Sequence, residues 1–345
     1  MPTRPTIVID SYGGVDSPLR ALRVAADLSL TRRVQIVLVG HAPVLHAHLA
    51  TLSYDPANLR LVGTSIDYPP HTGDHLAEHR VLHRTLPLCL SLLEQGEGDA
   101  LVTAASESVV WQVVTERCQR IRADIAPAMA AVIPTLARSS SDDPFALVLD
   151  VSGNSSANAR QLRSWAALGG AYSRVVSGVR RPEVALLSTG RDQDQGPQSV
   201  TQAYRALQTH TDIQFVGNIQ AVDIPRGLAD VVVCDGFTGN AVRGVLEGVT
   251  QLTVEAARYA WRSKFAWRAG LRLLSSGVGM LKQVSEFQRY GGAPILGLQQ
   301  LVFVTQPDAS QLALENGVRL AAKCVDRELL QALELALEQV PKEPS

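Results

Sequence analysis

The sequence predicts an α/β protein of three layers, in which a mostly parallel β-sheet lies between two layers of helices. Two observations support this fold class. Short apolar runs alternate with helix-length segments along the whole chain. The runs are apolar at nearly every residue, as strands are when helices cover both faces of a parallel sheet. Such alternation is typical of βαβ units, which bind ligands in the loops beyond the carboxyl ends of their strands.

The expected strands are runs of Val, Ile, Leu, Ala and Phe: TIVID at 6–10, VQIVLVG at 34–40, LRLV at 59–62, ALVT at 100–103, FALVLD at 145–150, VALL at 184–187, IQFV at 213–216, VVVC at 231–234 and LVFVT at 301–305. Helical segments are expected at 19–30, 73–95, 107–119, 158–177, 198–209, 240–274 and 311–339. Pro18 precedes the first, and proline is favoured in the first turn of a helix. No internal repeat or low-complexity linker interrupts the pattern, so we expect one domain over residues 1–340.

Composition excludes several classes of protein. The 345 residues include 32 basic and 33 acidic side chains, so a net charge of −1 argues against electrostatic capture of nucleic acid. No apolar run approaches the roughly 18 residues that a membrane-spanning helix needs. The four cysteines are scattered without paired spacing, which is typical of reduced, buried thiols. We therefore expect a cytoplasmic protein.

The first expected strand ends in a loop that contains Asp10, Gly13 and Gly14. Paired glycines let the backbone approach a ligand closely, and the helix that follows offers free N–H groups to an anion. A tight strand-to-helix turn without a ligand explains the same residues.

The loop Asp235-Gly236-Phe237-Thr238-Gly239-Asn240 joins a strand to a long helix. Two glycines, a hydroxyl and an amide at a helix N-terminus can hold a phosphate or a developing oxyanion. Asp235 either orients a neighbouring group or caps the helix. Helix capping with two turn glycines is the alternative interpretation.

A third segment, Tyr290-Gly291-Gly292-Ala293-Pro294-Ile295-Leu296-Gly297-Leu298, is rich in glycine and proline and precedes the last strand. We interpret it as a turn whose backbone can lie against a substrate, since glycine places no side chain in the way. A purely structural turn is the alternative.

Together, the three segments resemble the PlsX phosphate acyltransferases, and the resemblance covers essentially the whole chain. The FVGN sequence at 215–218 and the spacing of Asp150 and Asn154 agree with it. The resemblance implies a fold similar to that of isocitrate and isopropylmalate dehydrogenases, and a homodimer. It also implies transfer of a fatty acyl group from acyl carrier protein to inorganic phosphate, which gives acyl phosphate for phospholipid synthesis. Neither a metal nor an organic cofactor is implied.

The implied chemistry suits loops of this kind, because phosphate is itself a nucleophile and needs no catalytic serine or cysteine. The protein has to hold the anion beside a thioester and stabilise the oxyanion that develops. In this hypothesis the catalytic residues are Asp235, Thr238 and Asn240. The substrate-binding residues are Asp10, Gly13, Gly14, Asp150, Asn154, Gly190, Asn218, Gly236, Gly239, Tyr290, Gly291, Gly292 and Pro294.

Several polar positions depart from the family pattern. The family's G-G-D is Gly13-Gly14-Val15, its S-A-G-N-T-G aligns with TAASES at 103–108, and its H-G-S-S-D aligns with QPDAS at 306–310. A basic K-K-D-S-S stretch aligns with residues 81–85, and a loop lysine is Gln195. Two alternatives therefore stay open: a catalytically silent paralogue that binds carrier protein or membrane, and a phosphotransacylase that uses coenzyme A thioesters.

The segment 255–289 is basic and amphipathic. Its candidate contact residues for an anionic membrane or an acidic partner are Arg258, Trp261, Arg262, Lys264, Phe265, Trp267, Arg268, Leu271 and Arg272. The resemblance agrees, since it implies protruding helices here, peripheral membrane contact and proximity to the downstream glycerol-3-phosphate acyltransferase. A helix in a dimer interface is the alternative.

His75, His79 and His83 share one face of an expected helix. Histidines four residues apart can chelate a transition metal, but no carboxylate or cysteine clearly completes the set. We expect a solvated, weakly basic face there and no metal site.

Overall fold

The computed structural model describes residues 4–14, 18–68, 75–135, 144–209, 213–263 and 291–341. The strands are β1 (Thr6–Asp10), β2 (Gln35–His41), β3 (Leu59–Thr64), β4 (Ala100–Thr103), β5 (Ala128–Pro134), β6 (Phe145–Leu149), β7 (Glu183–Leu187), β8 (Gln214–Ile219), β9 (Val231–Val233), β10 (Ala293–Leu296) and β11 (Leu301–Val304). The helices are α1 (Leu19–Thr31), α2 (Ala42–Leu49), α3 (His75–Glu94), α4 (Glu107–Arg117), α5 (Ala159–Tyr172), α6 (Gln198–Leu207), α7 (Gly236–Ser263), α10 (Gln311–Asp326) and α11 (Leu329–Glu338). A π-helical turn, Ser173–Ser177, follows α5, and a 3-10 turn, Ala221–Asp223, follows β8.

One sheet of 11 strands runs through the molecule in the order β3-β2-β1-β4-β11-β10-β5-β6-β9-β7-β8. The first five of these strands are parallel to one another, and so are the last four. Between them, β10 is antiparallel to β11 and β5, and β5 is antiparallel to β6. The sheet thus consists of two parallel halves that run in opposite directions and join at β10 and β5.

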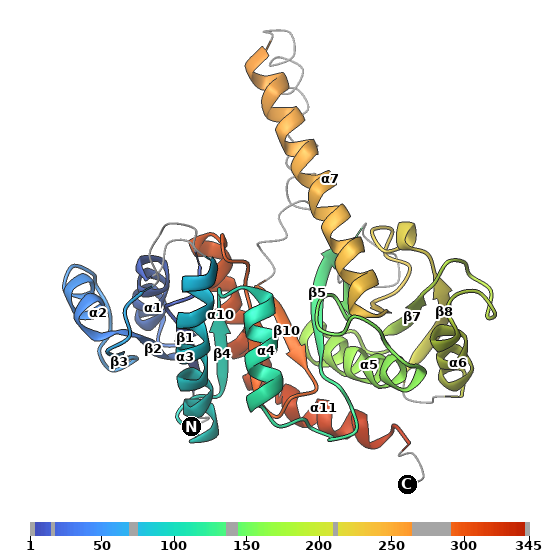
Figure 1. The fold of residues 1–345 in the computed structure, drawn as a ribbon, viewed down its shortest axis with the longest axis horizontal. Helices are drawn as coiled ribbons and strands as arrows, with labels where there is room; N and C mark the ends of the chain where they lie inside the picture. The colour runs from blue at the N-terminus through green and yellow to red at the C-terminus, as the bar shows by residue number, and fades with distance from the viewer. Residues whose placement is uncertain are drawn as a thin grey trace.

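Helices cover both faces of this sheet, as the sequence predicts (Figure 1). Side chains alternate along β1, so that Ile7 and Ile9 enter one core and Val8 enters the other. The first core is closed by α1, α2, α5, α6, α10 and α11, and the second by α3, α4 and the start of α7. The α/β fold of three layers is confirmed.

The structure corrects the sequence-based boundaries at the junction of the two halves. Strand β5 was not predicted, and the segment interpreted as a glycine-proline turn contains β10, where Pro294 pairs with Phe303. A short helix, α2, was also missed. The expected helix 311–339 is two helices, because Glu328 has the left-handed φ of 53°. Leu312 belongs to the apolar pattern of this segment, but it is 52% exposed and therefore not part of the core.

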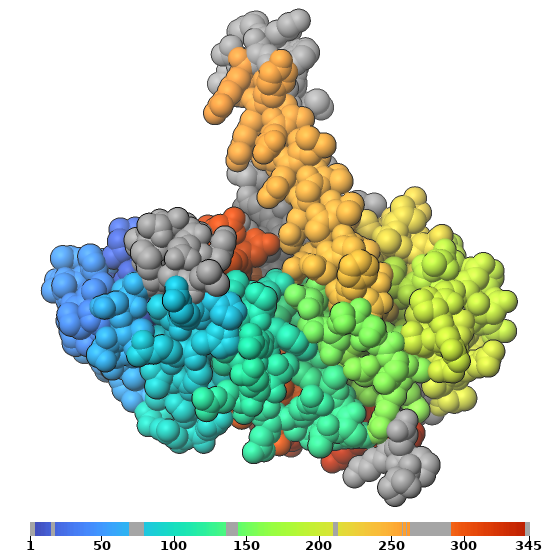
Figure 2. All heavy atoms as spheres, viewed as in Figure 1, coloured from blue at the N-terminus to red at the C-terminus, as the bar shows by residue number. Residues whose placement is uncertain are grey.

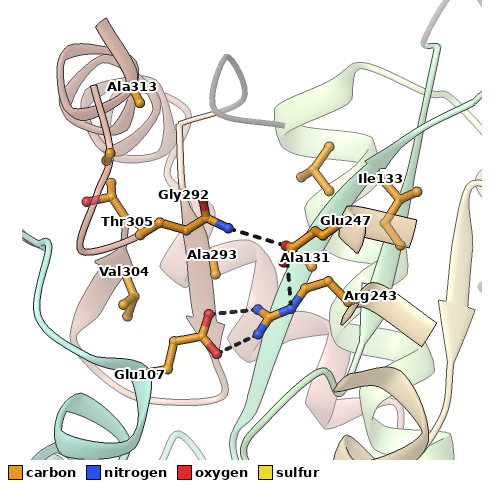
Figure 3. Close-up of a pocket in the computed structure, with 13 residues that line it drawn as sticks. Glu107, Ala131, Ile133, Arg243, Glu247, Gly292, Ala293, Val304, Thr305 and Ala313 are labelled. Atoms are coloured by element: carbon orange, nitrogen blue, oxygen red, sulfur yellow. Dashed lines mark hydrogen bonds and ion pairs between the residues drawn. The ribbon is translucent and has the colours of Figure 1, made fainter. Parts of the chain in front are cut away.

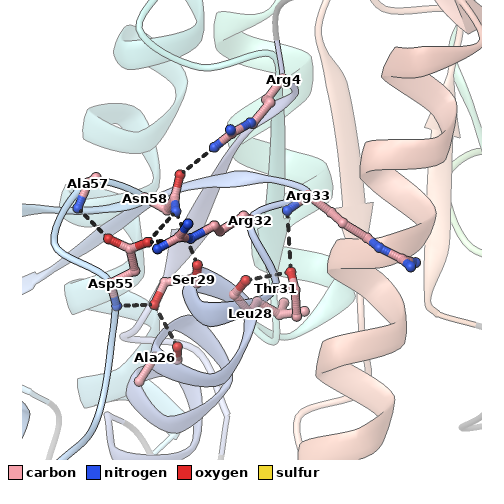
Figure 4. Close-up of polar contacts among 10 residues, drawn as sticks. All are labelled: Arg4, Ala26, Leu28, Ser29, Thr31, Arg32, Arg33, Asp55, Ala57 and Asn58. Atoms are coloured by element: carbon pink, nitrogen blue, oxygen red, sulfur yellow. Dashed lines mark hydrogen bonds and ion pairs between the residues drawn. The ribbon is translucent and has the colours of Figure 1, made fainter.

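The edge of the first half is fastened by a polar cluster at the end of α1 (Figure 4). Buried Asn58 donates to Ser29 O and to Asp55, and it accepts a hydrogen bond from Arg4 at 2.9 Å. The Ser29 hydroxyl in turn accepts the N–H of Asp55 at 2.9 Å. These bonds hold the turn before β3 against α1 and thereby fix the position of β3 at the edge of the sheet.

Helix α7 begins at the sheet and then leaves the body of the protein (Figures 1 and 2). It begins at Gly236, four residues before the predicted start. Along its free length Val245, Val249, Leu252 and Tyr259 are between 57% and 69% exposed. They recur at three, four and seven residues, so they form one apolar stripe along the helix.

Candidate active site

Asp10 organises the loop after β1. Its carboxylate is 1% exposed and accepts the N–H of Tyr12 at 2.9 Å and the Thr103 hydroxyl at 2.8 Å. Burial raises the pKa of Asp10, and these donors lower it in part. A Cβ at Gly13 would lie 2.3 Å from Ala105 N, so glycine is needed where the loops after β1 and β4 touch. At Gly14 the φ is +96°, which again requires glycine.

Asp150 has the same role in the other half of the sheet. It is fully buried, and its carboxylate accepts five donors: the N–H groups of Met129, Ser152, Gly153 and Asn154, and the Asn154 amide. The Asn154 amide also donates to Pro127 O at 2.9 Å. Both side chains were predicted to bind substrate, and in the structure the Asp150 carboxylate and the Asn154 amide nitrogen are bonded to other groups of the protein.

The predicted anion cradle at the start of α7 is largely satisfied from within. The two carboxylate oxygens of Asp235 accept the N–H and the hydroxyl of Thr238, at 2.9 and 2.8 Å. Gly236 N–H donates to Asn154 O at 2.7 Å. Gly239 packs so closely that a Cβ there would lie 1.9 Å from Asp150 O. Asp235 is thus a helix cap, and the glycines allow α7 to rest on the Asp150 loop.

The loop after β7 closes on itself. Asn218, 5% exposed, donates to Asp192 O at 2.8 Å, and Gln195 lies across Gly190, where it takes the space of a Cβ. The Oδ1 of Asn218 is buried and has no hydrogen bond within the described structure. This loop belongs to the second half of the sheet, as do Asp150 and Asp235, whereas Asp10 and the two glycines at 13 and 14 belong to the first half.

Of the third predicted segment, Gly292 lines a cleft, while Gly291 packs against Asn316 O and Pro294 is buried within β10. Tyr290 lies outside the described residues.

The cleft lies where the two halves of the sheet meet, and it holds about 70 Å³ (Figure 3). Arg243 reaches it from α7 and is held by both carboxylate oxygens of Glu107, the first residue of α4, at 2.7 and 2.8 Å. Arg243 Nε is buried, makes no hydrogen bond within the described structure and lies 3.9 Å from Glu247. Gln306 donates to Glu247 at 3.3 Å.

Charge in the cleft is held by these three side chains. Burial lowers the pKa of Arg243, but its hydrogen bonds and its attraction to Glu107 outweigh burial and raise it. Burial also raises the pKa of Glu247, a rise that Arg243 opposes and Glu107 reinforces. Glu247 therefore takes up a proton more readily than an ordinary glutamate.

Arg243 and Glu247 were not predicted, and Glu107 was noticed only as a departure from the family pattern. One signal was available for the first two. Residues 236, 240, 243 and 247 share a helical face, so the polar side chains at 243 and 247 extend the face that begins at the predicted Asn240. Asn240 indeed accepts a hydrogen bond from Arg243 at 3.2 Å.

The cysteine beside the loops is chemically inert. Cys234 Sγ lies 3.4 Å from Asp150 O, and burial raises the pKa of its thiol well above the usual value, with the charges of Asp235 and Asp150 adding to the effect. All four cysteines are buried and free, as predicted.

The basic segment is described only in part. Arg258, Trp261 and Arg262 are exposed on α7. Lys264, Phe265, Trp267, Arg268, Leu271 and Arg272 lie outside the described residues. Among the described helices, none combines the length and the apolar character needed to cross a bilayer. The rings of His79 and His83 are 4.4 Å apart, and within the described part of the chain no three His, Cys, Asp or Glu side chains are grouped to hold a metal ion.

The sequence of this chain is similar to those of known phosphate acyltransferases. The phosphate acyltransferase of Gloeobacter violaceus is 29% identical over 340 residues, which is 96% of each chain, and that of Brevibacillus brevis is 28% identical over 334 residues, 96% of this chain and 97% of that one.

Solved structures agree in fold. A phosphotransacetylase from Streptococcus pyogenes superposes with a TM-score of 0.60 at 15% identity, and covers 94% of this chain and 95% of its own. A 4-hydroxythreonine-4-phosphate dehydrogenase from Klebsiella pneumoniae superposes with a TM-score of 0.52 at 13% identity, and covers 98% and 100%. The fold is thus of the isocitrate dehydrogenase-like type. The model of the fatty acid synthesis protein family matches residues 6–332, so the chain belongs to that family, the family of the PlsX phosphate acyltransferases.

Proposed function

We propose that this protein is a phosphate acyltransferase, which transfers a fatty acyl group from acyl carrier protein to inorganic phosphate and forms acyl phosphate for phospholipid synthesis. The full-length likeness to proteins of that name supports the reaction class. One observation assigns the proposed reaction to the cleft: Arg243 is the one cation among the described residues that line it, and phosphate is an anion.

In the proposed reaction, phosphate binds to the guanidinium of Arg243 in place of the Glu107 carboxylate. A phosphate oxygen attacks the thioester carbonyl carbon, so that a C–O bond forms and the C–S bond breaks. The sulfur leaves as a thiolate and takes the proton that hydrogen phosphate carried, which gives acyl phosphate and the free thiol of the carrier. Arg243 holds the nucleophile beside the carbonyl, and the buried setting strengthens its attraction for the anion.

The reaction is tested by trapping acyl phosphate with hydroxylamine after the protein is mixed with hexadecanoyl carrier protein and phosphate. We expect hydroxamate that depends on both protein and phosphate. Replacement of the carrier protein by hexadecanoyl coenzyme A in a parallel assay identifies the preferred thioester. The absence of hydroxamate with either donor would overturn the proposal.

A second candidate function is that of a silent paralogue, which binds acyl carrier protein without turnover. It is favoured by one specific observation: Glu107 already accepts hydrogen bonds from both terminal nitrogens of the Arg243 guanidinium, an edge that an anion would use. Binding of hexadecanoyl carrier protein measured by calorimetry, together with no hydroxamate, would support this candidate.

We also infer a homodimer of single-domain chains that touches an anionic membrane at its edge. The stripe of Val245, Val249, Leu252 and Tyr259 is too apolar for a solvated helix, and a second copy of the same helix would cover it. Arg258, Arg262 and Trp261 lie at the outer end of the described helix and suit the membrane surface and the downstream glycerol-3-phosphate acyltransferase.

A further inference from the structure

Glu107 leaves one edge of the Arg243 guanidinium uncovered. It accepts hydrogen bonds from the two terminal nitrogens, whereas the third nitrogen, Nε, is buried and has no hydrogen-bond acceptor among the described residues. Glu247 lies beside this edge, with its Oε1 atom 3.9 Å from Nε (Figure 3). A buried N–H group without an acceptor is costly, so this edge of the arginine is where a further acceptor stabilises the cleft.

A single oxygen atom fits between Arg243 and Glu247. A water molecule can lie about 2.9 Å from both Nε and Oε1, so that it accepts the Nε–H and donates to the carboxylate. Gln306 donates to the same Oε1 at 3.3 Å, and a carboxylate oxygen has lone pairs for both donors. The cleft of about 70 Å³ has room for a few water molecules. The two side chains thus form a seat for one water molecule, with a carboxylate in position to take its proton.

The charges of the cleft favour water over phosphate at this seat. One arginine stands against the carboxylates of Glu107 and Glu247, and the charge of the exposed Asp308 also acts on Glu247. These carboxylates repel a phosphate anion, which in addition has to displace Glu107 before it reaches the terminal nitrogens of Arg243. Water is neutral and reaches Nε while the ion pair stays intact.

We propose that the cleft also hydrolyses the acyl thioester, with Glu247 as the general base and the Nε of Arg243 holding the attacking water. The inference rests on the proposed function, because it takes the same acyl donor. It goes beyond that function, because water replaces phosphate as the acceptor and the product is a free fatty acid.

In this second reaction the water oxygen attacks the thioester carbonyl carbon while Glu247 takes one of the water's protons. A C–O bond forms, and the C–S bond breaks as the tetrahedral intermediate collapses. The sulfur leaves as a thiolate and takes the proton that Glu247 holds, which gives the free thiol of the carrier. The other product is a fatty acid, which loses its proton to the solvent. Phosphate is already ionised and needs no such base, so only hydrolysis depends on proton transfer to Glu247.

The titration of Glu247 supports this role. Burial raises its pKa, Arg243 opposes the rise, and Glu107 and Asp308 reinforce it. A carboxylate with a raised pKa is a stronger base, provided that it is ionised. Hydrolysis therefore decreases as the pH falls through this raised pKa, and the decrease begins at a higher pH than it would with an ordinary glutamate.

The first test is the release of thiol in a phosphate-free buffer. The protein is mixed with hexadecanoyl carrier protein, free thiol is measured with a chromogenic disulfide and hexadecanoate by mass spectrometry, and the rates without protein are subtracted. We expect thiol and hexadecanoate in equal amounts. No release above the rate without protein would overturn the proposal.

Glu247→Gln tests the base. A general base contributes about 100-fold or more to a rate, so we expect hydrolysis to fall by about that factor. When phosphate and hydroxylamine are also present, the ratio of hexadecanoate to hydroxamate falls at least tenfold. Glu255→Gln is the matched control, because Glu255 is exposed on the same helix, and it keeps both rates.

The product ratio and thermal melts of the variants separate a lost base from a damaged fold. A damaged fold lowers both products equally, so the ratio stays the same and the melting temperature falls. An unchanged ratio in Glu247→Gln, or a hydrolysis rate equal to that of the wild type, would overturn the role of Glu247.

Failure of the proposed function is distinguishable from failure of this inference. Hexadecanoate without hydroxamate at any phosphate concentration, with the hexadecanoate lost in Glu247→Gln and kept in Glu255→Gln, would refute phosphate acylation and support hydrolysis. Hydroxamate in the presence of phosphate, together with no thiol release in its absence, would do the reverse.

Discussion

Both carboxylate oxygens of Glu107 accept a hydrogen bond from the guanidinium of Arg243, a residue 136 positions further along the chain. Glu107 opens α4 in the first half of the sheet, and Arg243 lies in α7, which follows β9 in the second half. The side chains are 23% and 17% exposed, so the pair is largely withdrawn from water. It therefore joins the two halves and, at the same time, occupies the cation to which we propose that phosphate binds.

Arg243→Gln tests the cation. The change removes charge-assisted hydrogen bonds that contribute about 1.5–3 kcal/mol each, so kcat/KM for phosphate falls by at least tenfold. Steady-state rates at varied phosphate measure the loss. Arg205→Gln, on the exposed face of α6, is the matched control and leaves the rates unchanged. A normal phosphate dependence in Arg243→Gln would show that the anion binds elsewhere.

Glu107→Gln tests whether the carboxylate competes with phosphate. The variant keeps a side chain of the same size but removes the negative charge, so Arg243 becomes available and the KM for phosphate falls several-fold. The same change lowers the melting temperature, because a largely buried cation loses its partner. A KM that stays the same or rises, in a folded variant, contradicts competition by Glu107.

Glu247 predicts a pH dependence. Burial raises its pKa above the ordinary value, so as the pH falls Glu247 becomes neutral before an exposed glutamate does. The negative charge of the cleft then decreases and the affinity for phosphate rises. In Glu247→Gln this part of the dependence disappears, while the titration of phosphate itself remains. Calorimetry at several pH values gives the affinity of each protein for phosphate, and the ratio of the two affinities isolates the effect of Glu247. A ratio that stays constant with pH would show that Glu247 does not influence phosphate binding.

The sequence predicted the layers but not the join between them. The local pattern predicts that Ile7, Val8 and Ile9 alternate between two cores, because every residue of a strand has to be apolar when helices cover both faces of the sheet. Strand β10 was missed because Gly291, Gly292 and Pro294 are residues that normally end strands, and their pairing with β11 and β5 is a property of the assembled sheet.

The predicted site residues remain a prediction, and local sequence could not show which of their polar groups are available to a ligand. An aspartate beside glycines at the end of a strand is compatible with a ligand site, and equally with a loop in which the carboxylate accepts hydrogen bonds from the protein's own backbone. Only the structure reveals that the oxygens of Asp150 and Asp235 are already bonded. The contact of Arg243 with Glu107 links two distant helices, and no local pattern encodes it.

The apolar stripe on α7 predicts an effect on assembly. Val249→Asp places a charge at its centre, where Val249 is 57% exposed in the single chain, and we expect it to shift the proposed dimer toward monomer. Sedimentation velocity over a range of concentrations measures the shift. Gln251→Asp, an exposed position on a different face of the helix, keeps the wild-type state. Identical sedimentation of the two variants would place the dimer interface elsewhere.

Two glycines of α7 allow the helix start to be tested against the helix itself. A Cβ at Gly239 would lie 1.9 Å from the backbone oxygen of Asp150, whereas a Cβ at Gly244 would meet no described atom within 4 Å apart from its own helix backbone. Gly239→Ala therefore has to displace α7 from the Asp150 loop, at a cost of about 1–3 kcal/mol, and lowers both stability and activity. Gly244→Ala instead gains about 0.8–1 kcal/mol from helix propensity. Denaturant unfolding of both variants gives the sign directly. If Gly239→Ala is as stable as the wild type, the first turn of α7 is free to move relative to the Asp150 loop, and its backbone N–H groups regain the role in anion binding that the motif first suggested.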